Sequence, residues 1–123
     1  MSDSILATTK KALGLDSEYD VFDPEIIMHI NSAFSALTQI GVGPSEGFMI
    51  TDEFNTWTEL LDGDPRLNNV KTYIYLKVRL LFDPPAASNL VTAFNDQLRE
   101  IEWRINVTSE EKKWVDPLNT TTT

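Results

Sequence analysis

The side chains of this sequence that could take part in chemistry are one histidine and two groups of carboxylates. His29 is the only histidine and cysteine is absent, which excludes disulfides, thiolate metal sites and a cysteine nucleophile. The acids gather at residues 16–25 and 52–53, but neither group has the Asp-x-Asn/Asp-x-Asn/Asp-Gly order of a calcium loop. We therefore expect solvated acids and a histidine at the border of its helix. A hydrolase that uses two of the carboxylates is an alternative.

The segment Gly41-Val42-Gly43-Pro44 lacks the features of a phosphate-binding loop. It follows a helical pattern rather than a strand, and no Gly-Lys-Ser/Thr comes after it. Basic residues in the second half of the chain are interleaved with acids, so they form no stripe that would bind nucleic acid. The sequence thus predicts no catalytic, cofactor-binding or metal-binding residues and a protein that is not an enzyme.

The chain has the length of one domain, and its charge is unevenly distributed. Of its 123 residues, the first 62 hold two lysines and eleven acids, whereas the remaining residues hold eight bases and eight acids, so the net charge of −9 lies in the first half. An acidic surface repels DNA phosphates and anionic lipid. The start lacks the order of a signal peptide, and no apolar run reaches the roughly 18 residues of a membrane helix. We expect a soluble protein made in a cytoplasm.

Helix start and stop signals alternate along the chain. The expected helices begin at Ser2, at Asp23, at Asn55 or Thr56, at Asp64 and at Ser88 or Asn89, and the stops fall at Gly14, Gly41, Gly63 and Phe82. These signals predict an all-α fold, a small bundle of four to five helices within one domain at residues 1–107. A long irregular loop at about 41–56, with a possible short strand at 48–50, and a flexible C-terminal tail at 108–123 complete the expected organisation.

The stretch YIYLKVRLLFDPP belongs to an expected helix that is apolar on nearly every side. A core stripe is formed by Leu67, Val70, Ile74, Val78 and Leu81. Further apolar sides are supplied by Tyr73, Tyr75, Leu76, Leu80 and Phe82. In the last helix, Trp103 lies outside the core stripe of Leu90, Val91, Phe94, Leu98, Ile101 and Ile105. A helix that is apolar all round must be covered all round, so it is either the central helix of the bundle or meets another subunit.

Four stretches together resemble a known family: FDPEIIMHINSAFSALTQIGVGP, ITDEFNTWTELL, VKTYIYLKVRLLFDPPAASNLVTAF and QLREIEWRINV. They are similar to the head–tail connector, or adaptor, proteins of long-tailed double-stranded DNA phages, of the type common in phages of Gram-positive hosts. The resemblance implies a structural virion protein that assembles as a ring of dodecamer type under the portal. Such a ring extends the DNA channel and docks the next neck or tail protein.

The resemblance gives several residues an expected role. The candidate subunit interface consists of Tyr73, Tyr75, Leu76, Leu80, Phe82 and Trp103, because a closed ring needs two adhesive sides on each subunit. Channel-facing acids are expected at Glu46, Asp52 and Glu53, past which DNA would slide without specific binding. Trp114 and Val115 in the tail are candidates for docking to the portal or a neck protein. Alternatives are an acidic DNA mimic, an antitoxin-like inhibitor, or another neck or tail-completion component.

Overall fold

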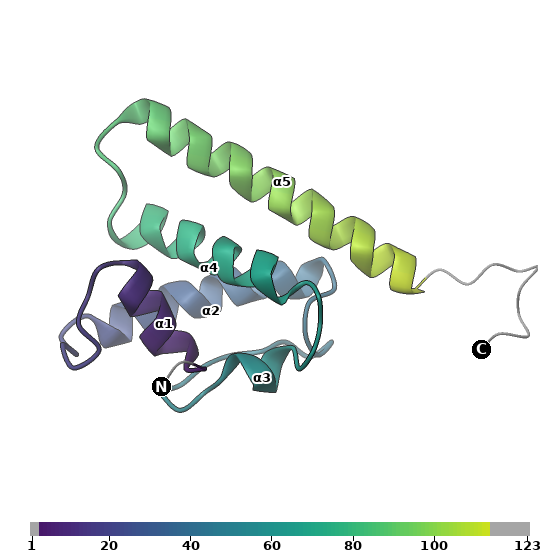
Figure 1. The fold of residues 1–123 in the computed structure, drawn as a ribbon, viewed down its shortest axis with the longest axis horizontal. Coiled ribbons are helices and arrows are strands. Elements are labelled where there is room, and N and C mark those ends of the chain that lie inside the picture. The colour runs from purple at the N-terminus through teal and green to yellow at the C-terminus, as the bar shows by residue number, and fades with distance from the viewer. Residues whose placement is uncertain (1–2, 114–123) are drawn as a thin grey trace, which may run out of the picture.

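The computed structural model describes residues 3–113, and helices are the regular elements of this part of the chain (Figure 1). Its five helices are α1 (Ile5–Ala12), α2 (Asp23–Gln39), α3 (Trp57–Leu60), α4 (Leu67–Phe82) and α5 (Ser88–Lys113). Within these residues no strand forms, and the segment 41–56 is an irregular loop. The expected all-α bundle is therefore confirmed.

The start of α1 is fixed by a side chain other than the one expected. Ser4, rather than Ser2, is the N-cap, and its hydroxyl oxygen accepts a hydrogen bond from the backbone of Ala7 at 3.1 Å. This satisfies one of the free N–H groups of the first turn. Ser4 also forms an isolated antiparallel bridge with Thr56, so the beginning of the chain is tied to the beginning of α3.

The loop between α2 and α3 is held by a side chain, Asn31, that makes the two backbone hydrogen bonds a neighbouring strand would make. The expected strand at 48–50 is absent; instead the Asn31 amide accepts from the Ile50 N–H at 2.8 Å and donates to the Ile50 carbonyl at 2.9 Å. Thr56 then caps α3 in a reciprocal capping box with Glu59. These bonds satisfy loop backbone that has no ladder partner.

The start of α2 differs from the expected cap in a way that matters for packing. Phe22 is the N-cap and Asp23 is the first helical residue, with no side-chain cap. The Asp23 carboxylate instead lies 2.8 Å from the ammonium of Lys10, which is almost fully buried. The pair joins α1 to α2. At the other end, Gly41 takes a φ of +94° and ends the helix, as the sequence predicts.

Helix α4 is the central element of the bundle. It packs against α2 on one side and α5 on the other, with α1 also in contact, and Figure 1 shows it between these two long helices. Buried residues of α4 and of the elements around it form one core, which includes Ile26, Ile30, Phe34, Leu37, Trp57, Val70, Tyr73, Ile74, Val78, Leu98, Ile101 and Ile105. Most of the apolar surface of α4 is therefore covered by its own chain, as expected for the central helix of the bundle, rather than left for another subunit.

Two residues expected in the core lie partly outside it. Leu81 near the end of α4 and Leu90 in the first turn of α5 are each 48% exposed. The connection that contains Pro84 and Pro85 cannot be helical, and the first turns of α5 diverge from α4 (Figure 1). At its other end, α5 continues to Lys113, six residues beyond the domain boundary expected at residue 107.

Candidate assembly surfaces

The residues of α4 that the sequence predicts at a subunit interface divide into a buried group and an accessible group. Tyr73 and Leu76 are buried by their own chain. The Tyr73 hydroxyl donates to Glu102 of α5 at 2.9 Å, and burial, together with this hydrogen bond and the negative charge of Glu102, raises the pKa of Tyr73 well above its usual value. In this conformation, neither Tyr73 nor Leu76 offers surface to a second copy, which corrects their placement in the interface.

The remaining selected residues keep some surface. Tyr75, Leu80 and Phe82 are half-buried against the core, and the ring of Phe82 meets that of Phe22 edge-on at 5.2 Å. Trp103 is 66% exposed on α5, on the side of the helix opposite the buried Leu98–Ile101–Ile105 stripe. An exposed tryptophan is a typical anchor of protein interfaces, so Trp103 is the most accessible of the six.

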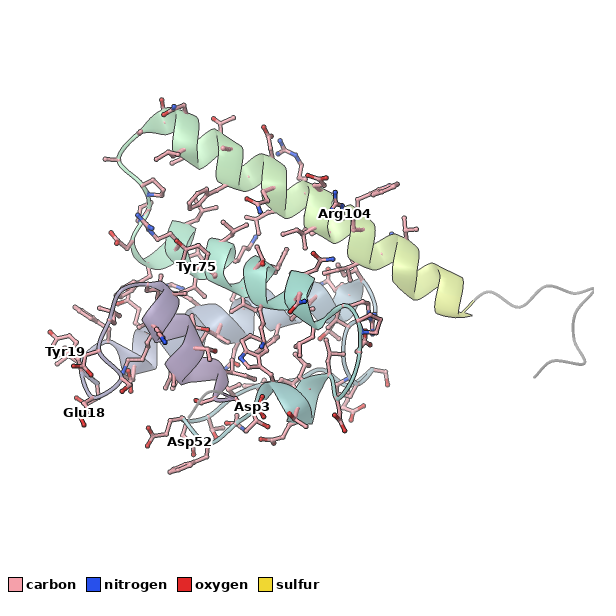
Figure 2. The ribbon with its side chains drawn as sticks, viewed as in Figure 1. Asp3, Glu18, Tyr19, Asp52, Tyr75 and Arg104 are labelled. Atoms are coloured by element: carbon pink, nitrogen blue, oxygen red, sulfur yellow. The ribbon has the colours of Figure 1, made fainter. Side chains whose placement is uncertain are left out.

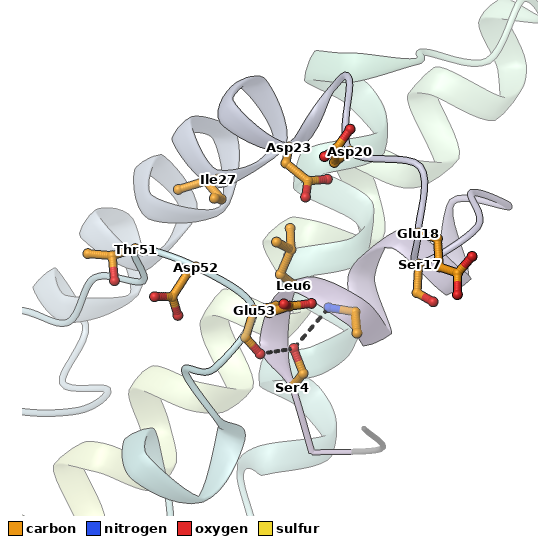
Figure 3. Close-up of a pocket in the computed structure, with 11 residues that line it drawn as sticks. Ser4, Leu6, Ser17, Glu18, Asp20, Asp23, Ile27, Thr51, Asp52 and Glu53 are labelled. Atoms are coloured by element: carbon orange, nitrogen blue, oxygen red, sulfur yellow. Dashed lines mark hydrogen bonds between the residues drawn. The ribbon is translucent and has the colours of Figure 1, made fainter.

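The two acidic groups of the sequence come together in space. A hollow of about 530 Å³ lies between the α1–α2 connection and the loop before α3, and its lining residues are drawn in Figure 3. Its acids are Glu18, Asp20, Asp23, Asp52 and Glu53. The Ser4 hydroxyl donates to the Glu53 carbonyl at 2.7 Å and holds the loop in place. The hollow concentrates negative charge from segments some 30 residues apart in sequence, a separation of about 100 Å in a fully extended chain.

The buried lysine beside this hollow positions one of its walls. The Lys10 ammonium pairs with Asp23 and also donates to the Ser17 carbonyl at 3.0 Å. It thus fixes the course of the α1–α2 connection, on which Glu18 and Asp20 lie. Sequence reasoning assigned Lys10 to the last turn of a helix and missed this contact, because the distance between Lys10 and Asp23 depends on how α1 folds onto α2.

Glu46, the third acid expected to face the channel, lies elsewhere. It lines a second hollow of about 680 Å³ on the outer side of α2, whereas Asp52 and Glu53 line the first. The second hollow also contains Met28, Phe48 and Met49. The structure therefore separates Glu46 from Asp52 and Glu53.

His29 has the surroundings expected of a border residue. Its ring is mostly buried, and its Nε2 lies 3.7 Å from a carboxylate oxygen of Glu25, one helical turn earlier. Among the residues that the structure describes, no group of three or more histidine, cysteine or acidic residues is arranged to hold a metal ion. Nothing in these surroundings assigns His29 the role of a catalytic base or a metal ligand.

Several exposed apolar side chains were not selected from the sequence. The largest are Tyr19, Val21, Phe22, Met28, Met49 and Phe54. A helical wheel identifies Met28, which lies outside the apolar stripe of α2. The others lie in irregular segments, where no periodicity separates inward from outward residues. Figure 2 shows Tyr19 and Asp52 on the sides of the molecule away from Arg104 of α5.

Trp114 and Val115, the candidates for docking, lie outside the described residues. Along residues 3–113, no helix has the length and hydropathy needed to cross a membrane.

Comparison with known proteins provides one match. A family model described as phage connector protein matches residues 5–112. No curated protein and no solved structure matches the chain. The match covers all five helices almost completely.

Proposed function

We propose that this chain, which belongs to the phage connector protein family, acts at the head–tail junction of the virion. It is a structural connector by family, and the proposal concerns its assembly: copies form a closed ring below the portal, extend the DNA channel and bind the next neck or tail protein. The observation that supports this most strongly is the family match over residues 5–112. A ring of dodecamer type and a Gram-positive host remain predictions, as does production in the host cytoplasm.

The distribution of apolar surface supports assembly through protein contacts. Exposed side chains such as Trp103, Met28 and Met49 lie on outer faces of the bundle, and large exposed apolar residues mark interaction surfaces when they gather. Of the interface candidates, we retain Tyr75, Leu80, Phe82 and Trp103. They supply contact area without changing the core of the subunit.

The acidic hollow supports the proposed passage of DNA. Carboxylates offer phosphates no cation to bind, so DNA passes along them without adhering. We keep Asp52 and Glu53 as channel-facing acids, together with the neighbouring acids Glu18 and Asp20, and we leave Glu46 out because it lies on the other hollow. A DNA mimic would need acids along an extended face, whereas these acids gather in one concave site.

Trp114 and Val115 stay candidates for docking to the portal or a neck protein. In the sequence they follow Lys113, the last residue of α5. We propose no cofactor, no catalytic residue and no membrane partner, in accordance with the structural role of the family.

The test is reconstitution with the purified portal protein of the same phage. We expect a complex whose mass, measured by light scattering after gel filtration, corresponds to one connector per portal subunit, and whose class averages in electron microscopy show a second ring. Removing residues 114–123 should weaken binding while the helical content stays unchanged. If the full chain and the portal elute separately at micromolar concentrations, the proposed assembly is wrong.

A further inference from the structure

The bundle presents a projecting side chain and a hollow on opposite outer faces. Because α4 lies between α2 and α5, the outer sides of α2 and α5 face away from each other. Trp103 projects from the outer side of α5, and the hollow of about 680 Å³ lies on the outer side of α2. Two different patches on opposite faces are what a head-to-tail contact between copies requires.

The hollow has room for an aromatic side chain and apolar residues that could contact it. It lies between α2 and the loop at 46–49, and its lining consists of Met28, Asn31, Ser32, Ser35, Thr38, Gln39, Glu46, Gly47, Phe48 and Met49. Met28 and Met49 are 61% and 68% exposed. Methionine adapts its shape to a partner and makes favourable contacts with aromatic rings. Hollows of roughly 300–1,000 Å³ hold drug-sized molecules, so an indole ring fits with room for its neighbours.

The charge distribution favours this pairing over a symmetric one. Of the residues that line the hollow, Glu46 is the one acid and none is basic, whereas α5 presents the exposed Arg99 and Arg104 near Trp103, each paired with an acid of the same helix. Two copies that met through their α2 faces would bring like charge together, which costs free energy. Contact between the α2 face of one copy and the α5 face of the next avoids that repulsion.

We infer that Trp103 of one copy inserts into the Met28–Met49 hollow of the next copy, and that this contact repeats head-to-tail around the ring. The inference rests on the proposed ring and specifies which surfaces form it. It assigns a role to the exposed methionines, and it places Glu46 at a subunit contact rather than in the channel.

The occupant is tested by cross-linking, for which a chain without cysteine is well suited. One variant carries Ser35→Cys inside the hollow, and a second carries Asn106→Cys, one helical turn from Trp103 and exposed. The two are mixed, assembled on the portal and treated with a short bismaleimide. We expect a dimer band in the mixture and none when either variant is assembled alone. Asp62→Cys, exposed between α3 and α4, replaces Asn106→Cys in the control mixture and should give no band.

The energetic test uses Trp103→Ala, with Gln97→Ala as the matched control. Gln97 is exposed on α5 about 120° from Trp103 around the helix. We expect Trp103→Ala to raise the concentration needed for assembly by roughly 30-fold, as for an interface anchor, and Gln97→Ala to leave it within about twofold. Met49→Asp, which places a charge in the hollow, should act like Trp103→Ala. Circular dichroism confirms that each variant is folded.

The outcomes separate this inference from the proposed function. If a ring assembles but the cross-link is absent and Trp103→Ala assembles normally, the inference is wrong and the ring remains. A band from Ser35→Cys alone would show a two-fold contact between α2 faces and would also overturn it. If the unmodified chain forms no ring on the portal, the proposed function fails and the inference with it.

Discussion

The buried ion pair between α1 and α2 allows a quantitative test of the fold. The Lys10 side chain is 2% exposed and that of Asp23 is 25% exposed, with 2.8 Å between ammonium and carboxylate. Lys10 also donates to the Ser17 carbonyl. The two partners therefore differ in how much water can replace the lost contact. Replacing Asp23 should cost more stability than replacing Lys10.

The expected magnitudes follow from this difference in exposure. Asp23→Asn leaves a buried ammonium without a counter-charge, for which a loss of about 3 kcal/mol is expected, the lower end for a broken buried pair because the Asn oxygen can still accept. Lys10→Met keeps the aliphatic stem and leaves a carboxylate that water reaches, so about 1–2 kcal/mol is expected. In the double variant no uncompensated charge is buried. Its loss should fall below the sum of the two single losses by about 1–3 kcal/mol.

Urea denaturation followed by far-ultraviolet circular dichroism measures all four free energies of unfolding, provided that the unfolding slope stays constant across the variants. The charge-preserving variant Lys10→Arg serves as a control for the counter-charge alone. If Lys10→Met costs more than Asp23→Asn, or if the two losses add within about 0.5 kcal/mol, the pair does not couple α1 to α2 as described.

Three further changes test other parts of the structure. Gly43 has a φ of +78°, and an added Cβ would lie 2.9 Å from a methyl carbon of Leu60, so Gly43→Ala should lower the free energy of unfolding by about 1–3 kcal/mol in urea titrations. Tyr73→Phe should cost about 1 kcal/mol at neutral pH by loss of the bond to Glu102. The folded state raises the pKa of Tyr73 above its usual value of about 10. Its contribution to stability is therefore complete below about pH 10 and declines progressively as the pH rises further, so the phenylalanine variant should lose less stability in alkaline titrations. Trp103→Ala should change the free energy of unfolding of the monomer by no more than about 0.5 kcal/mol, because the side chain is exposed.

The helices could be predicted from the sequence because their signals are local. Asp23-Pro24, Gly41 and Pro84-Pro85 act through the backbone of their own neighbours, and the resulting boundaries agree closely with α2 and the end of α4. The side-chain roles at these boundaries were less accessible. Asp23 fits the pattern of a cap but pairs with Lys10 instead, because a partner from another helix competes with the local cap.

The position of apolar residues was predictable only where a helix has a single buried face. On α4, the wheel indicates several apolar sides, and only the packing of α2 and α5 decides which are covered. Tyr73 is thus buried whereas Leu81 is exposed, in contrast to the prediction for both. In the irregular loop no period exists, so the exposure of Met49 and Phe54 could not be derived.

The acidic groups show what sequence alone leaves undecided. Their existence was evident, but the closeness of Asp52 to Glu18 and Asp20 depends on the contact between the N-terminal segment and the loop before α3. The same folding places Glu46 on another face. Residues 52 and 46 are near neighbours in the chain, yet they belong to different surfaces.

A cryo-electron-microscopy map of the head–tail junction in intact virions tests the central claim most directly. We predict that the five helices fit a closed ring of copies immediately below the portal, with the DNA channel continuing through its centre. A map in which this chain is absent from the neck, or is bound there as separate copies that do not touch, would contradict the account.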